Sequence, residues 1–198
     1  DKTVYANRDP RLTATVVYNG YVWKDRNDKG EYVTKGTINV TSGNDKAGTD
    51  NGSPTGFYTR KYFDTTHGKN LEMWTNIIMM RYADVLLMYA EALAESGSSL
   101  GDALVWLNKT RTRAGLDALK AEDIPSKGAF IEALADERGR EFALEGHRWF
   151  DLVRLGLALD RFHEMGYKLD AHNLLFPIPQ NQIEIVNDKT ILWQNPGY

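Results

Sequence analysis

The most restrictive feature of this sequence is the charged stretch ERGREFALEGHRWFDLVR, residues 137–154, because its apolar positions recur with the period of an α-helix. On a helical wheel at roughly 100° per residue, the segment 131–153 has one apolar stripe. The stripe contains Ile131, Leu134, Ala135, Phe142, Trp149, Leu152 and Val153. Arg138 and Glu145 fall inside this stripe, and Glu141 lies on its border. A charge on a buried face costs several kcal/mol unless it is paired, so these charges must be neutralised within the fold.

The spacing of these charges offers partners within the same helix. Acidic and basic residues three positions apart lie on neighbouring turns, where they can form ion pairs. The pattern predicts the pairs Arg138–Glu141, Glu145–Arg148, Arg148–Asp151 and Asp151–Arg154. We interpret these six residues as a buried ion-pair scaffold that holds helices together.

An acid–base pair is the alternative interpretation of the same stretch. Glu141 and Glu145 could serve as the two carboxyl groups of a glycoside hydrolase. A general acid needs a raised pKa, however, and arginine neighbours on adjacent turns favour the ionised form of both groups. We therefore expect no catalytic residues and no enzyme activity.

Helical periodicity extends over the centre of the chain. Apolar residues recur from residue 82 to about 95, Gly97 is a stop signal, and Ser99 with Asp102 forms a capping box for a second helix that reaches about residue 114. This helical hairpin has the size of a tetratricopeptide unit. Ser126 can cap a third helix, whose period continues to residue 155, with a break expected at Gly146.

The two ends of the chain show weaker patterns. Residues 13–23 and 31–40 predict a short β-hairpin or a pair of extended segments, and residues 41–56 predict a long surface loop. We expect one domain over residues 1–198, with a loop-rich β segment (1–75), helical hairpins (76–158) and an irregular tail (159–198). The expected fold class is mainly α, with tetratricopeptide-like helix pairs packed against an irregular region that holds a small hairpin.

Composition excludes several functions. The net charge of −3 argues against nucleic acid as a partner, and no apolar run is long enough to span a bilayer. The sequence has no cysteine, and no pair among its four histidines has metal-ligand spacing, so we expect no metal and no cofactor. The chain lacks an initiator Met and a signal sequence, so we expect it to be the interior of a longer protein.

Aromatic residues in the first 75 positions are the candidates for ligand binding. Many sit in polar, glycine-rich sequence, and rigid aromatic planes can contact the apolar faces of sugar rings. Trp23 and Tyr58 flank polar loops and are the strongest candidates, followed by Tyr21, Tyr32 and Phe57. Trp74 belongs to the same aromatic group. The alternative for each residue is that it packs the β segments against the helices.

Four stretches together resemble the C-terminal portion of the SusD/RagB family, the nutrient-binding outer-membrane lipoproteins of Bacteroidetes. The stretches are RYADVLLMYAEALAESG (81–97), LNKTRTRAGL (107–116), ERGREFALEGHRWFDLVRLG (137–156) and LLFPIPQNQIEI with LWQNPGY (174–198). RDPRL (8–12) resembles the motif that opens the same region. The family pattern assigns a scaffold role to Glu137, Arg138, Glu141, Phe142, Glu145, Gly146, Arg148, Trp149, Asp151 and Arg154.

The resemblance implies a function in nutrient capture. Family members bind glycans at the cell surface without cleaving them and pass them to a SusC-like TonB-dependent transporter. It also implies an upstream half of the same protein, which carries the lipid anchor and part of the ligand site. No ligand residue can be transferred by motif, because the loop 41–63 lies where members differ most. A helical-repeat module that binds proteins and no small ligand remains the competing hypothesis.

Overall fold

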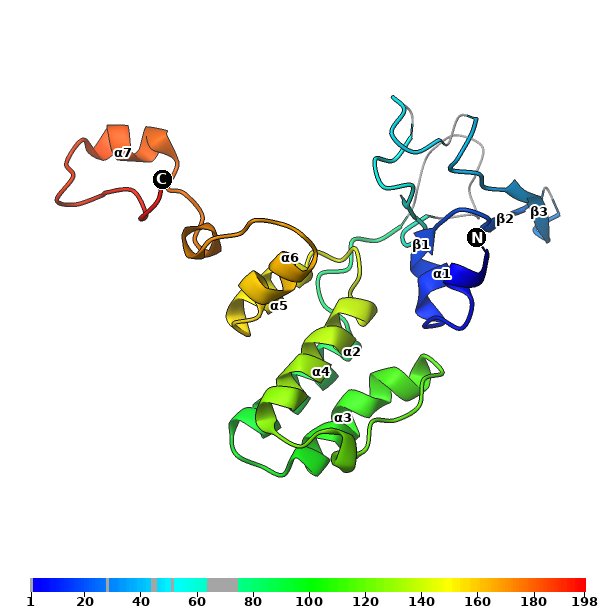
Figure 1. The fold of residues 1–198 in the computed structure, drawn as a ribbon, viewed down its shortest axis with the longest axis horizontal. Coiled ribbons are helices and arrows are strands. Elements are labelled where there is room, and N and C mark those ends of the chain that lie inside the picture. Colours follow the sequence, from blue (N-terminus) through cyan, green and yellow to red (C-terminus); the bar gives the residue numbers. More distant parts are fainter. Residues whose placement is uncertain (1, 28, 44–45, 51, 64–74) are drawn as a thin grey trace. The chain divides into compact units, whose positions relative to one another are not determined.

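The computed structural model describes residues 2–27, 29–43, 46–50, 52–63 and 75–198 (Figure 1). Contacts between residues divide the chain into two compact units, Asp1–Gly146 and His147–Tyr198. The described residues are mainly helical and include two small antiparallel sheets. This confirms the predicted fold class, whereas the extent of the expected single domain stays a prediction.

The first unit begins with short elements. These are η1 (Lys2–Tyr5), α1 (Arg11–Thr15), β1 (Val16–Val17), β2 (Val22–Arg26), β3 (Tyr32–Thr37) and β4 (Tyr58–Thr59). β2 and β3 form the predicted hairpin, with an irregularity in the register between Trp23 and Lys24. β1 instead pairs with β4 across the long loop. The prediction of an extended segment from residue 13 was wrong at its start, because residues 13–15 belong to α1.

A helical hairpin forms the body of the first unit. It consists of α2 (Tyr82–Glu95) and α3 (Leu100–Arg113), close to the predicted bounds. The backbone N–H of Asp102 donates to the Ser99 side chain at 3.1 Å, which confirms the predicted N-cap. Gly97 and Gly115 have φ values of +83° and +82°, in the left-handed region that ends helices and favours glycine.

The core lies where α2 and α3 meet α4 (Lys127–Glu141), and these three helices lie side by side (Figure 1). Ala90 and Ala103 are fully buried, and their small side chains allow α2 and α3 to approach closely. Phe130 and Leu134 of α4 are fully buried in the same cluster. The short helix η2 (Ala121–Asp123) connects α3 to α4.

The predicted long helix from Ser126 to residue 155 is interrupted earlier than expected. Ser126 caps α4 as predicted, with its hydroxyl accepting from the Ala129 N–H at 3.1 Å, but α4 ends at Glu141. A turn follows, in which Leu144 and Gly146 have positive φ values of 66° and 82°. Gly146 therefore lies inside the break, as predicted, but does not begin it. The helix resumes as α5 (Arg148–Arg154).

The second unit contains short helices: α5, α6 (Ala158–Glu164), η3 (Ala171–Leu174) and α7 (Gln180–Val186). The Trp149 ring packs edge-on against Phe162, with centroids 5.6 Å apart, and contacts Phe176 at 6.4 Å. The Gln194 side chain accepts from the backbone N–H of Ile178 at 2.8 Å and donates to the backbone carbonyl of Ile178 at 2.9 Å. These two hydrogen bonds join the segments before and after α7. The tail is thus more helical than predicted, since α7 extends the periodic piece expected near residues 183–186.

Candidate functional site

Three glutamates on successive turns form the most buried charged cluster among the described residues. Glu137 and Glu141 belong to α4, and Glu145 lies in the turn that follows. Their side chains are 0%, 1% and 6% exposed. A carboxylate at such depth must be compensated, so the identity of its partners decides what the cluster does. We call these glutamates and their basic partners the ion-pair centre.

Glu141 is held by three arginines from separate segments. Arg11 Nη1 of α1 donates to Oε2 at 2.8 Å, Arg81 Nη1 donates to Oε1 at 2.5 Å, and Arg113 Nη2 of α3 donates to Oε2 at 2.5 Å. Arg11 lies 130 residues away in the sequence. The carboxylate therefore joins α1, the start of α2, and α3 to the end of α4.

Glu145 is bound by Lys61 and Arg81. Lys61 Nζ donates to Oε1 at 2.6 Å, and Arg81 donates to both carboxylate oxygens at 2.9 Å. Lys61 Nζ also donates to the backbone carbonyls of Glu141 and Ala143, and Arg81 Nη2 donates to that of Glu141. The last carbonyls of a helix lack partners inside the helix, so these cations satisfy them and explain why α4 can end at Glu141.

Glu137 is the buried acid that the helical wheel did not place in the apolar stripe. Its Oε1 accepts from Arg11 Nη1 at 2.8 Å and from the Thr110 hydroxyl at 2.9 Å. Thr110 is itself buried in α3. The paired occurrence of RDPRL and ERGRE in one chain is the only sequence signal that could have linked Arg11 to this carboxylate.

The remaining residues of the predicted scaffold pair in two ways. Arg138, 4% exposed at the side chain, donates to Asp84 of α2 at 2.7 Å. Arg154 bonds Asp151 at 2.9 Å inside α5, which is one of the predicted pairs. Arg148 is half-buried at the start of α5. For Arg138, Glu141 and Glu145, the partners described above come from distant segments, whereas the sequence predicted partners on the neighbouring turn.

The electrostatics of Glu141 and Glu145 oppose acid–base catalysis. Burial raises the pKa of each carboxyl, but hydrogen bonds from Arg81, with Arg11 at Glu141 and Lys61 at Glu145, outweigh it and leave both pKa values below the ordinary range. Both groups are therefore ionised at neutral pH. A hydrolase needs one carboxyl that keeps its proton, so this pair cannot supply the general acid.

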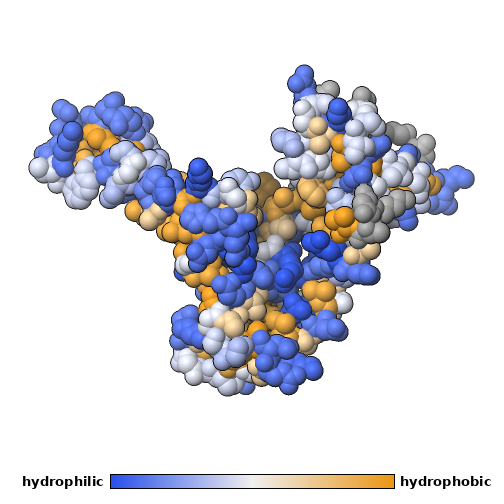
Figure 2. Space-filling view, in the orientation of Figure 1, coloured by the Kyte–Doolittle hydropathy of each residue, from blue (hydrophilic) through white to orange (hydrophobic). Residues whose placement is uncertain are grey.

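The aromatic candidates lie in the β region of the first unit, where rings form a continuous row. Tyr18 stacks on Tyr5 with centroids 4.1 Å apart and meets Tyr21 edge-on at 5.6 Å. Tyr21 lies 6.2 Å from Trp23, which meets Phe63 edge-on at 4.9 Å. Figure 2 shows hydrophobic and hydrophilic residues interspersed on the visible face of this region.

A cavity of about 350 Å³ opens at the end of this row. It is lined by Val17, Trp23, Ile38, Tyr58, Thr59 and Phe63, so it brings together the two strongest aromatic candidates. The Tyr58 hydroxyl accepts from the Ser53 N–H at 3.0 Å, which fixes the orientation of the ring. Arg60 lies over the Trp23 ring, 5.3 Å from its centroid.

The other three candidates lie around this cavity or away from it. Tyr21 contacts Trp23, whereas Phe57 is 45% exposed and lies edge-on to Tyr5 at 6.4 Å. Tyr32, 57% exposed, projects from β3 with the Arg26 guanidinium 5.0 Å from its ring centroid. Trp74 lies outside the described residues. The ring–ring contacts given above join aromatic residues of the β region to one another.

A metal-binding cluster and a membrane-spanning helix are both absent from the part of the chain that the structure describes. In those ranges, no group of three or more His, Asp or Glu side chains is placed to hold a metal ion. No helix in the same ranges is both long and apolar enough to cross a membrane.

The fold and the ion-pair centre together define a class: a mainly helical protein in which tetratricopeptide-like helices pack beside an irregular β region. Comparison with known proteins identifies the family. Residues 2–198 match the model of the SusD family, so the chain belongs to the SusD family. This confirms the resemblance found in the sequence motifs.

Individual relatives support this assignment. A crystal structure of a SusD-like protein from Bacteroides fragilis superimposes with a TM-score of 0.76 at 28% identity, covering 99% of this chain and 40% of that one. SusD-like protein P2 of Formosa agariphila is 34% identical over 148 residues, which are 70% of this chain and 29% of that protein. The starch-binding protein SusD of Bacteroides thetaiotaomicron is 33% identical over 132 residues, 63% of this chain and 22% of that protein. The chain thus spans less than a third of the length of these two relatives.

Proposed function

We propose that this protein binds a glycan at the bacterial cell surface without cleaving it. The observation that carries the proposal is the cavity in the β region, where Trp23, Tyr58 and Phe63 supply aromatic walls. Its volume lies within the roughly 300–1,000 Å³ of small-molecule sites. Rigid aromatic rings bind the apolar faces of sugars at little entropic cost. Membership of the SusD family and the similarity to a protein named for starch binding support the choice of a glycan.

The proposal assigns ligand contact to Trp23 and Tyr58 first, and to Tyr21 next because it contacts Trp23. Phe57 and Tyr32 remain candidates for contact with a longer oligosaccharide, since both are exposed outside the cavity. The ion-pair centre takes no part in binding. Its role is to hold α1, and with it the strands that follow, against the helical hairpin.

Calorimetric titration of the full-length protein with a panel of oligosaccharides tests this assignment. For the glycan that binds, Trp23→Ala and Tyr58→Ala should each weaken binding about tenfold or more, since stacking contacts on aromatic residues dominate such interfaces. Tyr167→Ala is the matched control, because Tyr167 is a 62% exposed tyrosine of the second unit and does not line the cavity. Unchanged affinity in both cavity variants would exclude the cavity as the site.

We further propose that the protein delivers its ligand to a SusC-like TonB-dependent transporter, and that an upstream lipid-anchored segment holds it on the outer membrane. Membership of the family supports both statements. The gene neighbourhood is the direct check: a transporter gene of this class next to the coding sequence is expected. Adjacent genes for polysaccharide-degrading enzymes would identify the substrate class.

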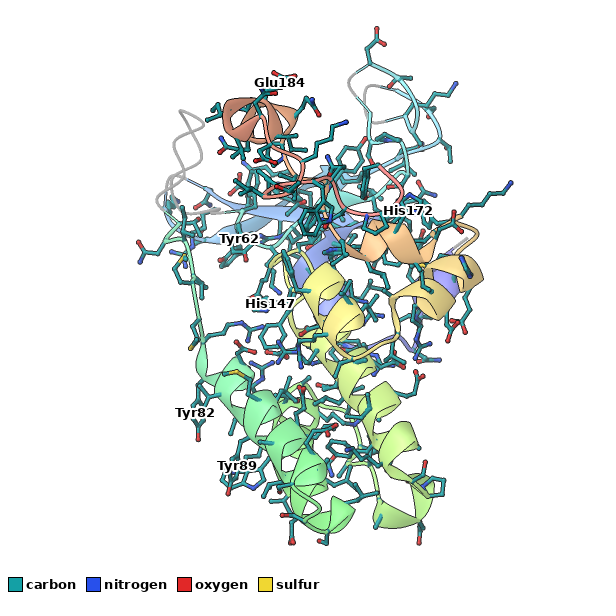
Figure 3. All side chains as sticks on the ribbon, turned by 90° about the vertical axis from the view of Figure 1, so that its left-hand side faces the viewer. Tyr62, Tyr82, Tyr89, His147, His172 and Glu184 are labelled. Atoms are coloured by element: carbon teal, nitrogen blue, oxygen red, sulfur yellow. The ribbon has the colours of Figure 1, made fainter. Side chains whose placement is uncertain are left out.

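The competing proposal, a helical module that binds protein, is favoured by one observation. The segment before α2 and one face of α2 expose large apolar residues, including Ile77 (88%), Met79 (85%) and Tyr82. Figure 3 shows Tyr82 and Tyr89 projecting from the same side of α2. Exposed apolar patches of this kind mark interaction surfaces. Under the competing proposal, a partner protein covers this face. We propose instead that another part of the same polypeptide covers it, because the relatives are much longer than the matched region.

Methionine oxidation can test which surface is covered. In residues 1–198 expressed alone, hydrogen peroxide should oxidise Met79 as fast as Met165, which is 57% exposed in the second unit. In the full-length protein, Met79 should become protected by a large factor relative to Met165. Equal rates for the two methionines in the full-length protein would contradict the proposed contact.

A further inference from the structure

A second cavity of the first unit lies between Tyr62, the segment before α2 and the turn after α4. It measures about 330 Å³, which is a volume typical of small-molecule sites. Its polar lining includes Tyr62, Thr75 and Asn76, and its apolar lining includes Ile78 and Leu144. We call it the Tyr62 cavity. It shares no lining residue with the cavity in the β region, so the two are separate sites.

Two residues with an unfavourable backbone conformation line the Tyr62 cavity. Tyr62 and Leu144 have φ values of +71° and +66°. In the described ranges, the other non-glycine residues with positive φ are two asparagines, which tolerate this region better than bulky residues do. A bulky residue keeps such a conformation only where the surrounding structure imposes it, and residues of this kind cluster at ligand sites. The surrounding structure therefore imposes the conformation of two walls of the cavity.

The ion-pair centre supplies the contacts that hold these two walls. Lys61 precedes Tyr62, and Glu145 follows Leu144. Lys61 Nζ donates to Glu145 Oε1 at 2.6 Å and to the backbone carbonyl of Ala143 at 3.0 Å. These bonds tie the residue before one wall to the residues on both sides of the other wall. The cavity is thus preorganised, and preorganisation reduces the entropic cost of binding.

The polar groups at the cavity suit a neutral ligand that is rich in hydroxyl groups. In the ranges that the structure describes, the side chains of Tyr62 and Asn76 have no hydrogen-bond partner. Burial and the charge of Glu145 raise the pKa of Tyr62, so its hydroxyl keeps its proton and can donate. The Asn76 amide can both donate and accept. Glu145, which also lines the cavity, is neutralised by Lys61 and Arg81, so an ionic ligand would find no uncompensated charge on the lining residues.

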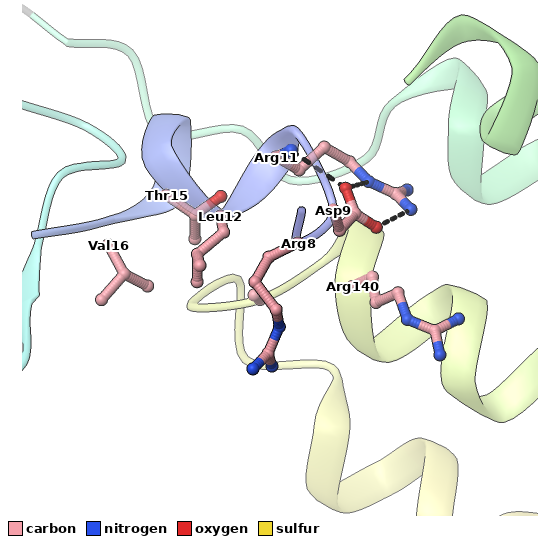
Figure 4. Close-up of a pocket in the computed structure, with 8 residues that line it drawn as sticks. Arg8, Asp9, Arg11, Leu12, Thr15, Val16 and Arg140 are labelled. Carbon is pink, nitrogen blue, oxygen red and sulfur yellow. Dashed lines mark hydrogen bonds and ion pairs between the residues drawn. The ribbon is translucent and has the colours of Figure 1, made fainter. Parts of the chain in front are cut away.

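The cavity beside α1, shown in Figure 4, lacks these features. No aromatic ring lines it, and its carboxylate, that of Asp9, is bonded to Arg11 at 2.7 Å. Arg140 is paired with Asp136 at 3.7 Å, and its guanidinium is directed away from that of Arg8. A single exposed arginine is left there, and one charge without a second converging group does not define a binding site.

The Tyr62 cavity and the cavity in the β region are lined by consecutive residues. Phe63 lines the cavity in the β region, where it meets the Trp23 ring edge-on at 4.9 Å. Tyr62 lines the other cavity. Consecutive Cα atoms are about 3.8 Å apart, so the two cavities open beside the same short stretch of backbone. One oligosaccharide of several units can therefore reach both.

We propose that the Tyr62 cavity is a second subsite for the same glycan and that it holds a neutral pyranose unit. The Tyr62 hydroxyl and the Asn76 amide bind the hydroxyl groups of this unit. Ile78 and Leu144 provide an apolar wall for the C–H face of its ring. This inference rests on the proposed glycan-binding function, whereas the place of the subsite rests on the preorganised walls and the two polar side chains without partners.

Calorimetric titration of the full-length protein with maltose and maltoheptaose tests the proposal, and the starch-binding relative supports the choice of glucose oligomers. Maltoheptaose should bind about tenfold or more tightly than maltose, because the longer chain occupies both cavities. Tyr62→Phe and Asn76→Ala should each weaken maltoheptaose binding about threefold to tenfold, which corresponds to one lost hydrogen bond. Neither variant should change the affinity for maltose, which occupies the cavity of Trp23 and Tyr58.

Tyr167→Phe is the matched control, because it removes the same hydroxyl from a 62% exposed tyrosine of the second unit and should leave both affinities unchanged. The melting temperatures of Tyr62→Phe and Asn76→Ala should equal that of the unaltered protein, since neither side chain has a described hydrogen bond to lose. No binding of maltoheptaose, equal affinity for the two saccharides, or unchanged maltoheptaose affinity in both variants would overturn the assignment. A glycan of the panel that still binds and still depends on Trp23 would show that the proposed function stands even then.

Discussion

Neutralising Glu141 should destabilise the protein strongly, because the Glu141 carboxylate joins three segments of the first unit. Glu141→Gln keeps the volume and one acceptor oxygen but removes the charge that faces Arg11, Arg81 and Arg113. Breaking a buried ion pair by neutralising one partner costs about 3–5 kcal/mol. Arg113 is 56% exposed, so solvent screening reduces its share to under about 1 kcal/mol.

The retained acceptor oxygen places the expected loss at the low end, about 3 kcal/mol of the free energy of unfolding. For a chain of this size, that loss corresponds to a melting temperature lower by about 6–12 °C. Urea titration followed by circular dichroism measures the free energy, and thermal melting gives an independent value. Arg11 would keep its ion pairs with Asp9 and Glu137 after this change, so it does not lose all of its partners.

Glu95→Gln is the matched control for this measurement. Glu95 also pairs with a cation, Lys127 at 2.6 Å, but the two side chains are 53% and 51% exposed. An exposed pair contributes at most about 1 kcal/mol. A loss for Glu141→Gln no larger than the loss for Glu95→Gln would contradict this prediction, because burial would then have no part in the energetics of the ion-pair centre.

Three further predictions test the same architecture. Arg138→Ala should lower the free energy of unfolding by about 3–5 kcal/mol, because it leaves the carboxylate of Asp84 buried without its partner at 2.7 Å. Urea titration measures this free energy, and a loss under about 1 kcal/mol would contradict the prediction. Ser99→Ala should cost about 1 kcal/mol through loss of the α3 N-cap, and an unchanged melting temperature would contradict that cap energy. Acid should destabilise the protein, because the pKa of Glu141 and the pKa of Glu145 in the folded state both lie below the ordinary 4.5. The contribution of these two carboxylates to the free energy of unfolding is therefore complete above that pH and is lost as the pH falls through their folded pKa values. Melting curves recorded at a series of pH values should show a shallower loss of stability for Glu141→Gln.

Local chemistry made much of the helical part predictable. The bounds of α2 and α3 follow from apolar periodicity, from the cap at Ser99, and from glycines at the ends of both helices. The burial of Arg138 follows from the helical wheel, which places it inside the apolar stripe, and Glu141, which the wheel places on the border of the stripe, is buried as well. The sequence motifs, taken as a set, were specific enough to indicate the family.

The aromatic region was only partly predictable. Composition selected Trp23 and Tyr58, and the structure places both on one cavity. The sequence could not show that Tyr5 stacks on Tyr18, or that β1 pairs with β4 across the loop. Short strands carry too few residues for a clear alternating pattern, so their pairing depends on the surrounding structure.

What the sequence determined by itself was therefore the helical character of the central segments and the burial of Arg138 and Glu141, because both depend on residues within a few positions of one another. Only the tertiary structure decided which cations neutralise those charges. Coulombic attraction depends on distance in space and not on separation in the sequence. The nearby Arg148 and the distant Arg11 and Lys61 were therefore equally possible partners for the glutamates. In the folded protein, Arg11 lies beside Glu141, which is 130 residues away in the sequence, and Lys61 donates to the backbone carbonyl of Glu141 at the end of α4.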